Sequence, residues 1–149
     1  MPRVPTKLPN ATENRNLSTP ERPIWKVEAL PCAEGDQFVV RFESQDPSWR
    51  HGIWLGVDGE FEIAGARSAQ AELWTDNAPT QVTVTVRATT DGLLRFYNVW
   101  DSGRGLQRES QSATSGMVRE EIRDGARYHC NDIGNDSEFT SIVFTVTRT

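Results

Sequence analysis

Hydrophobic and polar residues alternate with a period of two along three separate stretches of the chain. In residues 80–88, three valines alternate with threonine and arginine side chains. Residues 37–43 and 142–147 repeat the pattern, again with β-branched and aromatic residues at the apolar positions. Such alternation is typical of a strand with one buried face, because successive side chains of a strand point to opposite faces. The pattern therefore predicts strands at these three places.

Asp-Gly pairs separate several of the apolar stretches. Asp58–Gly59, Asp91–Gly92 and Asp124–Gly125 each lie between apolar or alternating runs, and such pairs tolerate the positive φ angles that tight turns require. The third pair is flanked by alternating residues at 117–122 and 126–130. We therefore expect turns at all three pairs and a hairpin at the third.

The spacing of these signals predicts an all-β protein. We count eight or nine short strands and no convincing helical period, although one helical turn within 64–73 is an alternative. Many short strands with frequent turns are typical of antiparallel sandwiches and barrels. We expect a jelly-roll-like antiparallel β-sandwich, with a closed β-barrel as the second choice. The chain contains no internal repeats, which argues against a propeller or a solenoid.

Residues 1–23 differ from the remainder of the chain. They contain five of the eight prolines and show no hydrophobic period. Such a segment buries too little apolar surface to offset the entropy lost on ordering. We predict a flexible, proline-rich arm over residues 1–23 and a single domain over 24–149. The arm could become ordered against a neighbouring subunit, so a homo-oligomer is one of the expected arrangements.

Charge and hydropathy exclude some classes of partner. The chain has a net charge of −5, and because the arm carries +2, the domain carries −7. This is a poor match for a phosphate backbone, so we expect no nucleic-acid partner. No run approaches the ~18 apolar residues of a membrane helix, and the opening residues do not resemble a secretory signal. We therefore expect a cytoplasmic protein without a membrane partner.

The most unusual stretch is the strand predicted at residues 93–101. One of its faces carries Leu94, Phe96, Asn98 and Trp100. A buried amide needs hydrogen-bond partners, because an unmet polar group costs ~1–3 kcal/mol. Aromatic rings beside amides also hold sugars, since the ring covers apolar C–H faces while polar groups orient the hydroxyls. Asn98 and Trp100 are therefore candidate ligand-binding residues; the alternative is a core strand whose amide bonds to neighbouring backbone.

Five further candidate ligand-binding residues follow from their positions. Trp49 lies in a predicted loop, where a large aromatic ring is costly to expose unless a ligand or partner covers it. Trp54 lies in a predicted half-buried strand, and Asp101 ends the aromatic strand. His129 is one of only two histidines, and Asp132 follows it closely. Both could serve as ligand contacts or as acid–base groups.

The sequence gives little support for a bound cofactor, and we expect none. The oxygen-rich loop at 131–138 could supply ligands to calcium, but its spacing does not match the helix–loop–helix calcium motif. Two histidines are too few for a multi-histidine metal centre. Cys32 and Cys130 are far apart and are expected to be unpaired in a reducing compartment, although a disulfide between two strands is an alternative.

Three functions are compatible with these observations. The first is a non-enzymatic module that binds a small ligand, with a saccharide as the favoured class, against Trp100, Asn98 and either Trp49 or Trp54. The second is a small β-barrel enzyme of the isomerase, cyclase or lyase type. Its acid–base groups would be Asp101, Asp132 or His129. The third is an interaction or assembly domain that uses the arm or a sheet edge.

Overall fold

The computed structural model describes residues 11–110, 112, 115–132 and 138–149. Nine β-strands and no helix are present in these residues, and so none of them forms a helix that could span a membrane. The strands are β1 (Thr12–Glu13), β2 (Trp25–Pro31), β3 (Gln37–Gln45), β4 (Arg50–Ile63), β5 (Ala66–Trp74), β6 (Gln81–Asp101), β7 (Gly116–Ile122), β8 (Gly125–Asn131) and β9 (Ile142–Arg148). The prediction of an all-β protein is confirmed.

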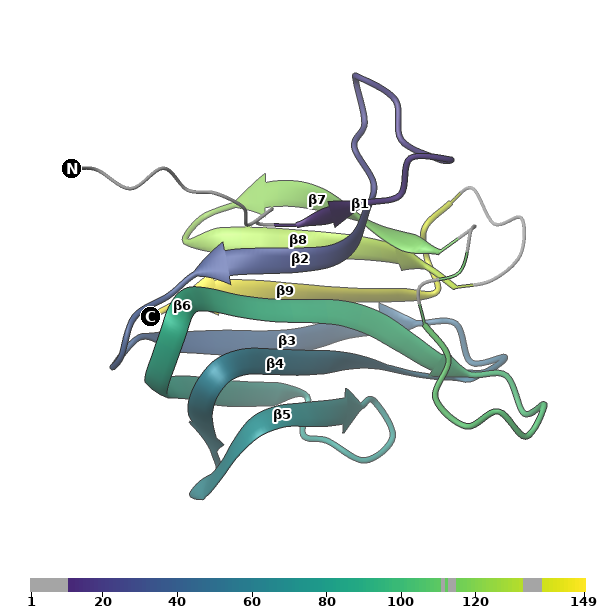
Figure 1. Cartoon of the computed structure of the whole chain (residues 1–149). Helices are drawn as coiled ribbons and strands as arrows, with labels where there is room; N and C mark the ends of the chain where they lie inside the picture. Colours follow the sequence, from purple (N-terminus) through teal and green to yellow (C-terminus); the bar gives the residue numbers. More distant parts are fainter. Residues whose placement is uncertain (1–10, 111, 113–114, 133–137) are drawn as a thin grey trace.

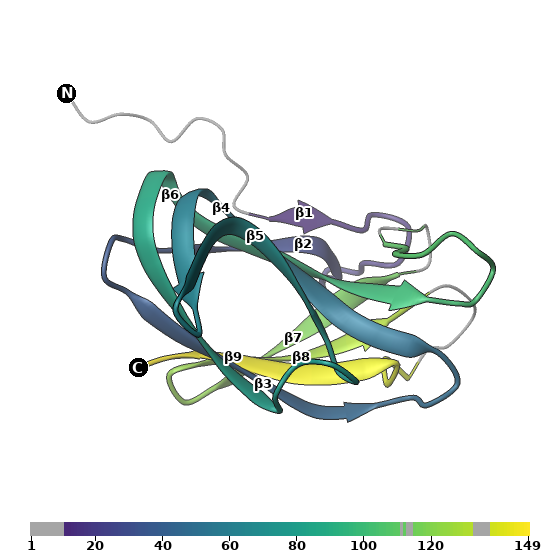
Figure 2. The same cartoon turned by 90° about the horizontal axis from the view of Figure 1, so that it is seen from below.

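Six of the strands close into an antiparallel barrel in the order β2-β7-β8-β9-β3-β6 (Figure 1). The strand β6 closes the ring because it is 21 residues long and has different partners at its two ends. Its first part, 81–85, pairs with β3, and its later part, 93–96, pairs with β2. The sheet continues beyond β6 through β4 to β5, and β4 and β6 curl together at the left of Figure 2. The fold is therefore the closed barrel, our second choice, rather than a sandwich.

The three Asp-Gly pairs have different roles in the structure. Asp124, with a φ of 65°, lies in the turn of the β7–β8 hairpin, which confirms the prediction there. Asp91–Gly92 lies inside β6, and Asp58–Gly59 lies inside β4 at a shift of register. Gly59 has a φ of 154°, and a Cβ at this position would come within 2.1 Å of the carbonyl oxygen of Ala88. Two of the expected turns are thus bends within long strands. The alternative of a helical turn within 64–73 is wrong, because β5 occupies that segment.

Three aromatic side chains fill the centre of the barrel. Phe96 of β6 contacts Tyr128 of β8 edge-to-face, with ring centroids 5.0 Å apart. Tyr128 is stacked on Phe144 of β9 at 5.4 Å. All three are fully buried, and aromatic pairs in these geometries add stability beyond the area they bury. The cluster therefore connects β6 with β8 and β9 across the interior of the barrel.

Side chains rather than a backbone ladder connect most of β2 to β7. The two strands pair only at Trp25 and Met117. Further along, the carboxylate of Glu28 points into the barrel, where Oε2 accepts hydrogen bonds from the Tyr128 hydroxyl at 2.8 Å and from Arg119 Nη1 at 3.3 Å. Glu28 is 4% exposed. A buried carboxylate is tolerated only when it is paired and hydrogen-bonded in this way.

Within the described part of the predicted arm, residues 11–23, the stretch 12–14 lies against the barrel, and 15–23 form a mostly exposed loop that protrudes from it (Figure 1). Strand β1 pairs with β2. The side chain of Asn14 is buried, and its Nδ2 donates a hydrogen bond to the carbonyl oxygen of Ser115 at 2.7 Å. Residues 1–10 of the predicted arm lie outside the described residues.

Candidate ligand-binding groove

The barrel brings three of the predicted site residues to one of its ends. Asn98 and Trp100 lie on the inner face of β6, and Asp132 directly follows β8. The side-chain amide of Asn98 donates a hydrogen bond to the carbonyl oxygen of Asn131 at 2.8 Å. The ends of β6 and β8 therefore meet across the barrel. This contact matches the structural alternative for Asn98, in which the amide bonds to neighbouring backbone.

The buried end of the barrel also contains His51. It lies opposite Trp100 in the β4–β6 register, and its Nε2 is 3.7 Å from Asp132 Oδ2. Burial lowers the pKa of the His51 imidazole, and the nearby charge of Asp46 opposes this only in part. The ring is therefore neutral at pH 7. His51 and Trp100 are each only 1% exposed, so neither can serve as a platform for a ligand that stays outside the barrel.

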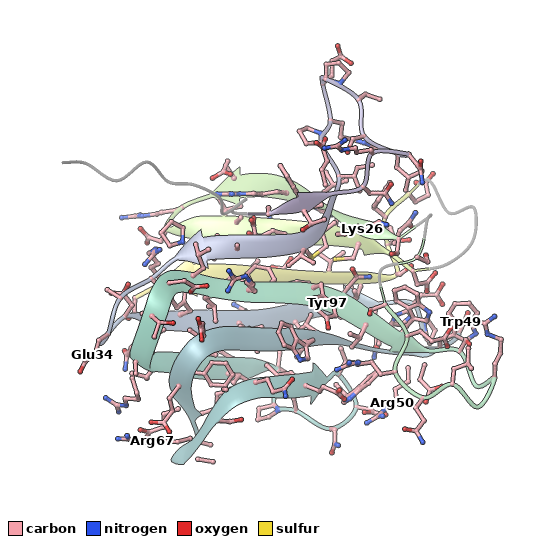
Figure 3. All side chains as sticks on the ribbon, viewed as in Figure 1. Lys26, Glu34, Trp49, Arg50, Arg67 and Tyr97 are labelled. Atoms are coloured by element: carbon pink, nitrogen blue, oxygen red, sulfur yellow. The ribbon has the colours of Figure 1, made fainter. Side chains whose placement is uncertain are left out.

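An open groove lies on the outside of the same end of the molecule. It measures about 430 Å³ and is formed by the β3–β4 connection, the β5–β6 connection and the end of β6. Figure 3 shows Trp49 and Arg50 at this end and Glu34 and Arg67 at the other. The lining residues are Gln45, Pro47, Ser48, Trp49, Arg50, Thr75, Asp76, Asp101, Ser102 and Gly103. Two predicted site residues, Trp49 and Asp101, are thus brought together.

Hydrogen bonds and an ion pair hold the groove in shape. Asp46 Oδ1 accepts a hydrogen bond from the backbone N–H of Ser48 at 2.8 Å, which fixes the turn before Trp49. The Arg50 Nε lies 3.0 and 2.9 Å from the two carboxylate oxygens of Asp76. Exposed pairs of this kind add little to stability, but this one fixes two polar groups on the groove wall.

The loop after β6 is tied down by Glu109. Its carboxylate accepts hydrogen bonds from the backbone N–H of Ser102 at 2.9 Å and from the Ser102 hydroxyl at 2.5 Å, and it pairs with Arg104. Partial burial raises the pKa of this carboxyl, but these donors outweigh it and lower the pKa to about 2. Since Ser102 lines the groove, Glu109 positions one of its walls.

We expect Glu109→Gln to lower the free energy of unfolding at pH 7. The further decrease in this free energy as the pH falls should be smaller in the variant than in the wild type. The carboxyl has a lower pKa in the folded state, so the stability it contributes is present above about 4.5 and is lost as the pH falls toward about 2. Urea unfolding across this range measures the effect, with Glu34→Gln at the opposite end of the barrel as the control. Parallel stability profiles for Glu109→Gln and the wild type would contradict the assignment.

Two other predicted site residues lie away from the groove. Trp54 is on the outer face of β4, stacked on Tyr97 with ring centroids 4.9 Å apart, and its Nε1 donates to Gln70 Oε1 at 2.9 Å. Tyr97 lies on the same outer face in Figure 3. The ring of His129 points outward from β8 and bonds to Glu120 at 2.8 Å. The structure therefore separates these residues from Trp49 and Asp101.

A second hollow, of about 480 Å³, lies between β5, the start of β6 and the turn that connects them. Its lining is Ile63, Ala64, Glu72, Leu73, Trp74, Asn77, Ala78, Pro79, Gln81, Val82 and Thr83. Sequence reasoning missed this hollow and missed Arg50 and Asp76 in the groove. The signal for Arg50 was its position next to Trp49, but nothing in the sequence linked either residue to Asp76.

The described residues provide no metal centre. Among them, no group of three or more His, Cys, Asp or Glu side chains could hold a metal ion. Residues 133–137 of the predicted calcium loop lie outside the described part of the chain. Both cysteines are free thiols. Burial raises the pKa of both Cys32 and Cys130, and so neither thiol is activated as a nucleophile.

Comparison of the chain with protein-family models, with curated proteins and with solved structures gave no match. The chemistry of the groove is therefore the main guide to function. It combines one half-buried indole ring with two carboxylates, one guanidinium, one amide and several hydroxyl groups. This set can cover an apolar face of a small molecule and exchange hydrogen bonds with its polar edge.

Proposed function

We propose that the protein is a non-enzymatic binding module that holds a saccharide in the groove beside Trp49. The observation that carries the proposal is the joining of the Trp49 ring with the carboxylates of Asp76 and Asp101 in one open hollow. A pyranose presents an apolar C–H face to such a ring, while its hydroxyls bond to the surrounding carboxylate and amide oxygens. The aromatic surface is supplied by Trp49, because Trp100 is inside the barrel.

The same geometry favours binding over acid–base catalysis. The groove is lined by Asp101 but not by either histidine. His51 is neutral and enclosed, and His129 is on another face in contact with Glu120. Catalysis near pH 7 needs a titratable group within hydrogen-bond reach of the reacting atoms. In this shallow aromatic groove Asp76 is paired with Arg50, and Asp101 accepts a hydrogen bond from the backbone N–H of Gly103, an arrangement that suits recognition better.

We expect Trp49→Ala to weaken saccharide binding at least about tenfold while leaving the fold intact. An indole in contact with a ligand is among the most costly side chains to truncate, and Trp49 lies in a connection rather than in the barrel core. Isothermal titration with glucosides, galactosides and mannosides measures the affinity, and a thermal melt reports folding. Trp54→Ala is the matched control, because its ring is stacked on Tyr97 outside the groove.

Two results would overturn the proposal. One is the absence of binding to any of these sugars at millimolar concentration. The other is sugar binding that Trp49→Ala leaves unchanged in a protein that melts normally.

A further inference from the structure

The second hollow has an apolar floor and one rigid aromatic wall. Leu73 and Val82 form the floor and are 8% and 6% exposed. The Trp74 ring forms the wall, and its Nε1 donates a hydrogen bond to Glu72 Oε1 at 3.1 Å. Arg108 Nη1 donates to the other oxygen of the same carboxylate at 2.7 Å. Both oxygens of this carboxylate already accept a hydrogen bond within the protein. The rest of the lining combines polar residues (Asn77, Gln81 and Thr83) with an apolar part that suits an uncharged apolar group.

A single stacked pair of side chains separates this hollow from the groove. The Arg50 guanidinium lies over the Trp74 ring, with Cζ 4.2 Å from the ring centroid. Arg50 lines the groove, whereas Trp74 lines the hollow. The two spaces are therefore adjacent, with the Arg50–Trp74 stack between them.

The turn between β5 and β6 faces both spaces. Thr75 and Asp76 line the groove, and the next three residues, Asn77 to Pro79, line the hollow. The turn is closed by hydrogen bonds from the backbone N–H groups of Asn77 and Ala78 to the carbonyl oxygen of Trp74, at 3.0 and 2.7 Å. One short rigid segment therefore holds a polar and an apolar subsite side by side.

We infer that the ligand is a glycoside, with its sugar in the groove and an alkyl or aryl aglycone in the apolar hollow. This inference rests on the proposed saccharide function and extends it to the chemical class of the ligand. The apolar aglycone loses contact with water against Leu73, Val82 and the edge of Trp74. Burial of apolar surface is favourable in proportion to its area.

Matched pairs of methyl and hexyl glycosides of the same sugar test the inference. Hexyl glycosides, used below the concentration at which they form micelles, should bind at least about tenfold more tightly than methyl glycosides. Burial of two methylene groups is sufficient for that difference. Titration calorimetry measures both affinities, and the fluorescence of the tryptophans provides a second signal.

Variants that fill the hollow separate the two subsites. Ala78→Phe and Thr83→Phe place a ring into the hollow from the turn and from the exposed side of β6. Either variant should abolish the hexyl advantage and leave the affinity for the methyl glycoside within about twofold of the wild type. Ala69→Phe, on the exposed part of β5 outside both spaces, is the control and should retain the advantage. Thermal melts identify any variant that fails to fold.

The outcomes distinguish this inference from the proposed function. Equal binding of methyl and hexyl glycosides, both weakened by Trp49→Ala, would overturn the aglycone subsite and leave the saccharide function in place. Hexyl binding that Ala78→Phe and Thr83→Phe abolish but Trp49→Ala does not change would show an independent apolar site and would also overturn the inference. Binding of neither glycoside would remove the proposed function, and the inference with it.

Discussion

Phe96→Ala should lower the free energy of unfolding by about 3–5 kcal/mol, the usual cost of removing a buried aromatic ring. Phe96 is fully buried and contacts both Tyr128 and Phe144. Its removal leaves a cavity in the middle of the barrel. Because the three strands there are held in place by their neighbours, the surrounding side chains can move little to fill the cavity. A loss of this size is a large part of the ~5–15 kcal/mol that stabilises most domains.

Urea unfolding followed by fluorescence measures this difference. Tyr97→Ala is the control, because Tyr97 is the next residue of β6 but points to the outer face, where it is stacked on Trp54. We expect Tyr97→Ala to lose about 0.5–1.5 kcal/mol from the ring stacking, in addition to the free energy of the apolar area that the side chain buries. Equal losses for the two variants would show that the inner aromatic cluster does not dominate the core.

Glu28→Ala should also be damaging, at about 1–3 kcal/mol, because it leaves a buried hydroxyl group without its hydrogen-bond acceptor. The variant leaves the Tyr128 hydroxyl without its acceptor and removes one of the two carboxylates beside Arg119. It also loosens the segment where β2 and β7 are not joined by a backbone ladder. Glu28→Gln should cost less, because the amide oxygen still accepts the tyrosine hydrogen bond.

The control for Glu28 is its counterpart on the surface. Glu121 also pairs with Arg119, with Nε and Oε2 2.6 Å apart, but its side chain is 72% exposed. Exposed pairs contribute about 0–1 kcal/mol, so Glu121→Ala should be nearly neutral. A similarly small loss for Glu28→Ala would mean that the buried carboxylate is not needed to hold β2 against β7.

The groove and the barrel core depend on different parts of the chain. The core residues lie on the strands, whereas Trp49 and Asp76 lie on the connections at one end. Substitutions in the groove should therefore change binding with little effect on folding, and the core substitutions should do the opposite. This separation makes the binding experiments interpretable, because a loss of affinity in a normally melting variant reports on the groove alone.

The alternation of apolar and polar residues by itself determined that the protein is all-β and where several strands lie. In 82–86 the valines are buried, as the period of two predicts. The inner face of 94–100 was also predictable, because the faces of a strand are set by the parity of its positions. The hairpin at Asp124 followed from local turn chemistry. These properties depend on neighbours in sequence, and so the sequence contains them.

Only the tertiary structure decided between a barrel and a sandwich, and which tryptophan lines the groove. An Asp-Gly pair suits both a turn and a bend, so Asp91–Gly92 could not reveal that β6 continues through it and pairs with different strands at its two ends. The groove joins Trp49, Asp76 and Asp101, which come from two separate connections and the end of β6. Their proximity is fixed by strand order and register, which depend on contacts between distant parts of the chain rather than on any local pattern.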